Sequence, residues 1–109
     1  MMLRGKLYDI ISRNERTAVV RLLGGCDIYS AHFPGFPITP GVTIVQIAVE
    51  LLSLIEGKTV DISSAKNIKF LVPVIPREDT TLTFEFGREG EITVYHEDVV
   101  CSRMKVSAD

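Results

Sequence analysis

One segment of this chain, residues 39–57, is apolar around almost the whole circumference of a predicted helix. Thr39 suits the N-cap position, Pro40 suits the first helical turn because a missing N–H costs little there, and Gly57 suits the C-terminal stop. The apolar positions between these ends are Val42, Ile44, Val45, Ile47, Ala48, Val49, Leu51, Leu52, Leu54 and Ile55. A helix of this kind is buried on nearly every side, so the rest of the chain must surround it.

The rest of the chain predicts strands, because branched and aromatic residues recur there in short alternating runs. Two hairpins are expected, one around the turn SRNE and one around the turn GREG, and two further strands follow the helix. The predicted strands cover residues 3–11, 16–23, 61–74, 81–86, 91–98 and 99–106. Five or six strands around one helix predict an α+β fold, with a single sheet wrapped around the helix in one domain over residues 1–109. The open edges of such a sheet predict a dimer that extends it.

Composition excludes several classes of function. The chain has 109 residues and a net charge of −2, so neither a nucleic acid nor an anionic membrane is an expected partner. The first ten residues alternate between apolar and polar side chains and carry charge, which is not typical of a signal peptide. No apolar run reaches the length of a membrane span. We therefore expect a cytoplasmic protein. Cys26 and Cys101 fit no zinc or redox spacing, so we expect two reduced thiols and no metal site.

The segment AHFPGFPITPGV, residues 31–42, places a histidine in a rigid loop before the helix. Three prolines restrict the backbone, so His32 is held at low entropic cost. The N–H of Gly41 lies in the first helical turn, where it lacks an intrahelical partner and where the positive end of the helix dipole lies. A carbonyl oxygen bound there would be polarised, and a nearby histidine could remove a proton from the adjacent carbon. The same pattern is also compatible with a histidine that only packs in a structural turn.

The helix carries a narrow polar stripe. Its members are spaced 3, 4 and 3 residues apart, which puts them on one face: Thr43, Gln46, Glu50 and Ser53. Two interpretations are open. Either the stripe faces water, or it lines a cleft in which Glu50 is placed to act as a general acid.

The segment HFPGFPITPGV resembles the active-site segment of the hotdog-fold 3-hydroxyacyl-[acyl-carrier-protein] dehydratases. Those enzymes carry a histidine followed by Phe-Pro, a second proline, and Pro-Gly-Val at the start of the central helix. The segment NIKFLVPVIPREDTTLTFEF is also similar to the part of those enzymes that follows the helix. The resemblance implies the hotdog fold, a curved antiparallel sheet wrapped around one long central helix, and a dimer with active sites at the interface.

The resemblance also implies a reaction and a set of site residues. His32 would remove the α-proton, and the N–H of Gly41 would bind the thioester carbonyl, with Phe33, Pro40 and Val42 in the substrate-binding set. The substrate would be a 3-hydroxyacyl chain on the phosphopantetheine arm of an acyl carrier protein, in fatty-acid or related acyl-chain biosynthesis. The products would be the trans-2-enoyl thioester and water, with no metal or nucleotide cofactor.

The helix departs from this family at one position. Gln46 stands where the family has its acidic residue, and Glu50 stands one turn later, where the family often has glutamine. A glutamine cannot protonate a departing hydroxide. Either the pocket is rearranged around Glu50, or the reaction has been lost or changed. The alternatives are a catalytically weak acyl-thioester-binding subunit that partners an active dehydratase, and an acyl thioesterase. We therefore expect one of two partner chains. The partner is either a second copy, in a homodimer or larger homo-oligomer, or a related subunit in a heterodimer.

Overall fold

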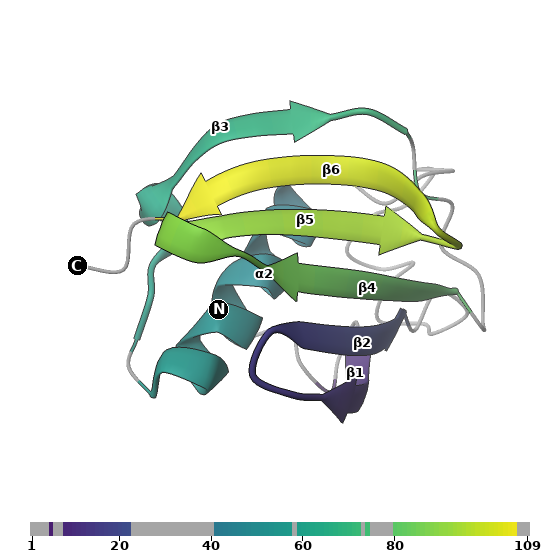
Figure 1. Cartoon of the computed structure of the whole chain (residues 1–109), viewed down its shortest axis with the longest axis horizontal. Helices are drawn as coiled ribbons and strands as arrows, with labels where there is room; N and C mark the ends of the chain where they lie inside the picture. The colour runs from purple at the N-terminus through teal and green to yellow at the C-terminus, as the bar shows by residue number, and fades with distance from the viewer. Residues whose placement is uncertain are drawn as a thin grey trace.

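Six antiparallel strands and one long helix make up the computed structural model, which describes residues 5, 8–22, 41–57, 59–72, 74 and 80–106. The strands form one sheet in the order β1-β2-β4-β5-β6-β3, and the helix α2 lies across its inner face (Figure 1). Two short 3-10 helices, η1 and η2, precede β3 and β5. The bounds are β1 Tyr8–Arg13, β2 Thr17–Leu22, α2 Gly41–Glu56, η1 Ile62–Ser64, β3 Ala65–Phe70, β4 Thr81–Phe86, η2 Arg88–Gly90, β5 Glu91–His96 and β6 Val99–Val106.

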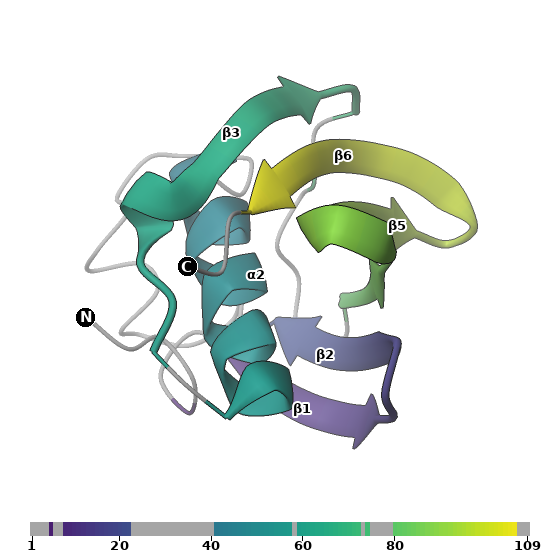
Figure 2. The ribbon, with the colours of Figure 1, turned by 60° about the vertical axis from the view of Figure 1, so that its left-hand side comes forward.

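The core lies between α2 and the concave face of the sheet, which curves around the helix (Figure 2). Alternate residues of the central strands point inward, and α2 contributes side chains from most of its circumference. Each of the largest fully buried side chains belongs to this one cluster: Tyr8, Val20, Leu22, Ile47, Val49, Leu51, Val74, Leu82, Phe84, Ile92 and Val94. The predicted buried helix and the α+β architecture are therefore confirmed.

Both predicted hairpins are confirmed, with one shift in position. The β4–β5 turn falls on the residues GREG, as predicted. The β1–β2 turn lies at residues 14–16, later than the predicted SRNE at 12–15. The cause is the side chain of Asn14, whose Oδ1 accepts hydrogen bonds from the backbone N–H groups of Arg16 and Thr17, each at 2.8 Å. This bond pattern lets Arg13 stay in β1, opposite Ala18.

The strand after the helix is shorter than predicted. Residues 61–74 read as one strand, but β3 covers only Ala65–Phe70. Asp61 accounts for the late start, because its backbone and side-chain oxygens accept hydrogen bonds from the N–H groups of Ser64 and Ser63, which closes the η1 turn. Asn67 adds a break inside β3, since its φ of 52° coincides with the register shift against β6.

The two edges of the sheet differ in character. The edge formed by β3 and the residues after it exposes a row of large apolar side chains: Ile68, Phe70, Leu71 and Val72. On β1, the opposite edge, Ile11 is the large apolar side chain that is exposed. Among the described residues, no helix is both long and apolar enough to cross a bilayer.

Two glycines make a matched test of this fold. Both have positive φ, +81° at Gly90 and +71° at Gly57, but only at Gly90 would an added Cβ overlap the carbonyl oxygen of Val106. We expect Gly57→Ala to lower the free energy of unfolding by about 1 kcal/mol, the cost of a left-handed residue. Gly90→Ala should cost clearly more, because β6 must also move. Urea denaturation measures both, and equal losses would contradict the close approach of η2 to β6.

Candidate active site

Two polar residues meet on α2 one helical turn apart. Gln46 and Glu50 are spaced i and i+4, which brings their side chains together on one face. The Nε2 amide of Gln46 donates a hydrogen bond to Oε2 of Glu50 at 2.9 Å. Glu50 is only 8% exposed, although it carries a carboxylate, and Gln46 is half-buried beside it. The helix therefore presents a coupled amide and carboxyl group, not two independent polar side chains.

Tyr8 of β1 completes this cluster from the opposite side. Its ring is fully buried, and its hydroxyl donates to Oε1 of Glu50 at 3.0 Å. The two carboxylate oxygens of Glu50 therefore accept from different donors, one on the same helix and one on the edge strand. Burying a carboxylate is costly unless such donors replace the lost water. We name Tyr8, Gln46 and Glu50 the helix triad.

Sequence reasoning missed Tyr8. The only local signal is a large side chain with a polar tip at an inward position of a predicted strand, and buried tyrosine hydroxyls usually find a partner. Nothing in the local pattern identifies Glu50 as that partner, because the two residues are 42 positions apart in the chain. The contact depends on how β1 docks beside the helix.

The rest of the polar stripe divides into different roles. Thr43, near the N-terminal end of α2, is 2% exposed, and its buried Oγ1 has no hydrogen-bond partner among the described residues. Ser53 is structural, since its Oγ donates to the carbonyl oxygen of Val49 and accepts from the N–H of Val60. With Thr43 and Glu50 both buried, the interpretation of the stripe as a water-facing surface is wrong.

The structure describes only some of the residues predicted to form the loop and the helix start of the site. His32, Phe33 and Pro40 lie outside the described residues, so their assigned roles stay predictions. Gly41 and Val42 open α2, which is where the predicted carbonyl-binding N–H groups must lie. Gln46 follows one turn after Val42, and Glu50 follows one turn after Gln46, so one face of α2 leads from the start of the helix to the triad.

The described cysteine is not placed for chemistry. Cys101 is buried in β6, where its Sγ donates to the carbonyl oxygen of Val94 at 3.4 Å. Burial raises the pKa of the Cys101 thiol, which keeps it protonated and unreactive. Among the described residues, no three His, Cys, Asp or Glu side chains lie close enough together to hold a metal ion.

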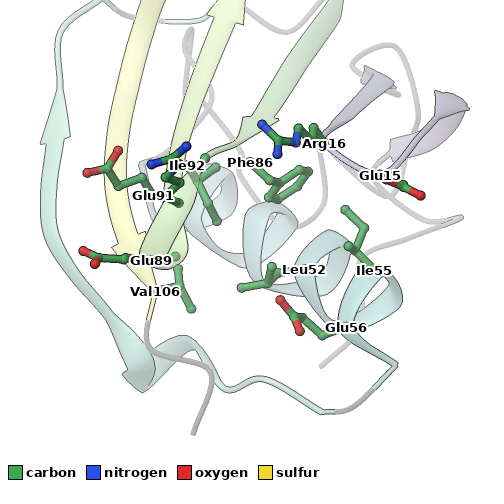
Figure 3. Close-up of a pocket in the computed structure, with 13 residues that line it drawn as sticks. Glu15, Arg16, Leu52, Ile55, Glu56, Phe86, Glu89, Glu91, Ile92 and Val106 are labelled. Atoms are coloured by element: carbon green, nitrogen blue, oxygen red, sulfur yellow. The ribbon is translucent and has the colours of Figure 1, made fainter.

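A pocket of about 560 Å³ lies beside the C-terminal end of α2, where Leu52, Ile55 and Glu56 line it (Figure 3). Its apolar floor is formed by Leu52, Ile55, Phe86, Ile92 and Val106. Glutamates and arginines from the β1–β2 and β4–β5 turns surround this floor, as Figure 3 shows. Of the predicted site residues that the structure describes, Gln46 and Glu50 are not among those that line this pocket.

Comparison with known proteins shows that the chain is similar to dehydratases. The family model described as ApeI-like, ApeI dehydratase, matches residues 11–105. The 3-hydroxyacyl-[acyl-carrier-protein] dehydratase FabZ of Streptococcus thermophilus is 28% identical over 102 residues, covering 86% of this chain and 72% of the relative. FabZ of Lactococcus lactis is 28% identical over 92 residues, covering 77% of this chain and 64% of the relative.

Solved structures show the same fold. The dehydratase heterocomplex ApeI:P from Xenorhabdus doucetiae superimposes with a TM-score of 0.60 at 21% identity, over 92% of this chain and 96% of the other. The PaaI protein of E. coli superimposes with a TM-score of 0.57 at 19% identity, over 91% of this chain and 79% of the other. With the six-stranded sheet around one helix, these likenesses confirm the predicted hotdog fold.

The contact between Tyr8 and Glu50 predicts energetic coupling. Tyr8→Phe removes the hydroxyl and keeps the ring, so we expect it to lower the free energy of unfolding by about 1–3 kcal/mol. Glu50→Gln should also destabilise, but the double variant should lose about 1 kcal/mol less than the sum of the two single losses. Urea denaturation measures all three. The control is Tyr95→Phe. Tyr95 is a half-buried residue of β5, and this change should alter the free energy of unfolding by less than about 0.5 kcal/mol. Strictly additive losses would show that the two side chains do not interact.

Proposed function

The chain belongs to the ApeI-like dehydratase family, and from this membership we propose that it removes water from 3-hydroxyacyl thioesters carried by an acyl carrier protein. The observation that carries the proposal is the helix triad, which puts a buried carboxyl group on the central helix one turn after the family's acidic position. The product is the trans-2-enoyl thioester, as part of fatty-acid or related acyl-chain biosynthesis. The chemistry consists of proton transfers, for which this proposal invokes no metal or nucleotide cofactor.

The start of α2 binds and activates the thioester in this proposal. The carbonyl oxygen accepts from the N–H of Gly41, where the helix dipole favours the negative charge that develops on it. Phe33, Pro40 and Val42 shape the pocket around the acyl group. His32 then takes the proton from the carbon next to the carbonyl, which forms the carbon–carbon double bond as the carbon–oxygen bond to the 3-hydroxyl breaks.

The departing hydroxide needs a proton, and this proposal assigns its supply to Glu50. In this role the carboxyl group of Glu50 gives up its proton while the Tyr8 hydroxyl and the Gln46 amide hold its oxygens. Both donors stabilise the carboxylate that remains after the transfer. The water that leaves contains the substrate's hydroxyl group and that proton, and the proton held by His32 returns to Glu50 through solvent between turnovers.

A second function has an observation in its favour. Both carboxylate oxygens of Glu50 accept hydrogen bonds within the chain, and Gln46 stands at the family's acidic position. A chain arranged in this way could bind the thioester while a related subunit supplies the acid. One structural relative, ApeI:P, is by its name a dehydratase heterocomplex, which fits this alternative.

The partner chain is proposed to pair along β3. This edge strand exposes Ile68 and Phe70, and Leu71 and Val72 continue the apolar row. Exposed apolar edges of this kind favour pairing with another strand, because pairing satisfies the backbone and removes apolar surface from water. A second copy of the chain, or a related subunit, would extend the sheet there.

Three helix variants, compared with the parent, separate the two functions. We expect the parent to dehydrate a short 3-hydroxyacyl pantetheine thioester and Glu50→Gln to slow it by about 10²-fold or more, because the acid is lost. Gln46→Glu places a second carboxylate against Glu50 and should be less stable. The double change Gln46→Glu with Glu50→Gln relieves that repulsion and should recover activity.

The control is His32→Ala, which should lose about 10²- to 10⁴-fold with the fold intact by circular dichroism. A parent that is active and indifferent to both helix positions would refute the helix-borne acid. A parent that is inert, and stays inert after the double change, would favour the binding subunit.

The proposed interface predicts a change in oligomeric state. Phe70 on the β3 edge and Ile11 on β1 are each 54% exposed, so substituting either one removes a comparable apolar surface. We expect sedimentation at micromolar concentration to show a dimer for the parent and for Ile11→Glu, and a shift toward monomer for Phe70→Glu. A parent that sediments as a monomer, or a Phe70→Glu variant that stays dimeric, would contradict pairing along β3.

A further inference from the structure

The pocket beside the C-terminal end of α2 has an apolar floor that no step of the proposed function uses. Leu52 and Ile55 come from α2, and Phe86, Ile92 and Val106 come from β4, β5 and β6. The floor is continuous with the core, and Ile55 is its most exposed member. The pocket volume of about 560 Å³ lies within the range of roughly 300–1,000 Å³ that small-molecule sites have. The pocket is therefore large enough for a ligand with a short apolar chain.

This floor lies on the other side of α2 from the helix triad. Successive residues are about 100° apart around an α-helix. Leu52 is therefore about 200° around the helix from Glu50, and Ile55 is about 180° around it from Gln46. The pocket and the two polar residues of the triad on α2 thus use opposite faces of the helix.

Two arginines from two different turns line the rim of the pocket. Arg16 belongs to the β1–β2 turn, and Arg88 belongs to the β4–β5 turn. The N–H of Phe86 donates to the carbonyl oxygen of Arg16 at 2.6 Å, which fixes Arg16 beside the floor, and Arg88 follows Phe86 by two residues. Figure 3 shows the Arg16 side chain next to Phe86. Both arginines are exposed, and neither takes part in an ion pair among the described residues.

The carboxylates around the pocket leave the arginine end positive. Oε2 of Glu89 lies 3.8 Å from Nζ of Lys105, so this carboxylate already has a cationic partner. In Figure 3 the side chains of Glu15, Glu89 and Glu91 point away from the floor. Glu56 lies on the opposite side of the floor from Arg16, at the last residue of α2, where the negative end of the helix dipole lies. The pocket is therefore polarised, with its cations at the two turns and its negative charge at the end of the helix.

We infer that this pocket binds an amphipathic anion, which is a carboxylate or phosphate head on a short alkyl chain. The head binds at Arg16 and Arg88, because planar guanidinium groups match the paired oxygens of either anion. The alkyl chain covers the floor and reaches toward Ile55. Glu56 and the end of the helix repel an anionic head, which gives the ligand one orientation. The inference does not depend on the dehydration reaction, since Tyr8, Gln46 and Glu50 are not among the lining residues.

Titration of the isotope-labelled chain, followed by two-dimensional NMR, measures both the affinity and the place of binding. We expect octanoate and octyl phosphate to shift the amide signals of Gly87 and Gly90, which line the pocket, and to leave those of β3 unchanged. Octanoate should bind about tenfold or more tightly than acetate, because its chain covers the floor. Octylamine has the same chain and a cationic head, so it should bind more weakly than octanoate. The tighter of the two anions identifies the preferred head group.

Two variants of equal charge test the arginines. Arg16→Gln with Arg88→Gln removes both guanidinium groups from the rim. Arg13→Gln with Arg103→Gln is the control, because it removes two exposed arginines that do not line the pocket. We expect the rim variant to raise the Kd of octanoate by about fivefold or more, since two exposed charge-assisted contacts are lost. The control variant should bind octanoate like the parent.

Three outcomes would overturn the inference. The first is equal affinity of the parent and the rim variant for octanoate, and the second is octylamine bound as tightly as octanoate. The third is octanoate that binds more weakly to His32→Ala and normally to the rim variant, because that ligand occupies the proposed active site. A parent that binds octanoate at the pocket and turns over no thioester would support this inference and defeat the proposed function.

Discussion

The sixteen residues of α2 carry apolar side chains on nearly every side, and the sheet curves around them to keep those side chains out of water. This burial is the constraint on which the other features of the molecule depend. It requires a long sheet with inward-facing apolar positions on each central strand, which the β2, β4, β5 and β6 sequences supply. It also means that a charged side chain on a buried face of α2, such as Glu50, needs hydrogen-bond partners inside the protein.

The helix triad is the consequence of that constraint. Glu50 is a buried carboxylate in an apolar core, and its two oxygens are held by Gln46 and by Tyr8. The tyrosine belongs to β1, so the candidate site is connected to an edge strand of the sheet as well as to the helix. A change in how β1 docks would alter the surroundings of Glu50. Stability and the proposed chemistry are therefore coupled through one hydrogen bond between distant parts of the chain.

The strand β3 presents two different surfaces. Its free edge and the residues that follow expose apolar side chains, which suits pairing with another chain. Its outer face carries Lys66 and Lys69, beside Arg103 and Lys105 of β6. The apolar edge and the basic outer face therefore point in different directions.

Local patterns in the sequence determined the helix, both hairpins, the last strand and the resemblance of the loop at His32 to dehydratases, because each depends on residues close together in the chain. Local polar groups moved some boundaries: Asn14 shifted the first turn, and Asp61 delayed β3. Only the tertiary structure decided that Tyr8 reaches Glu50 and that lysines and an arginine face each other across β3 and β6. Those contacts join residues more than thirty positions apart. They follow from strand order and register, which are set by burying the helix and not by any pattern within a single segment.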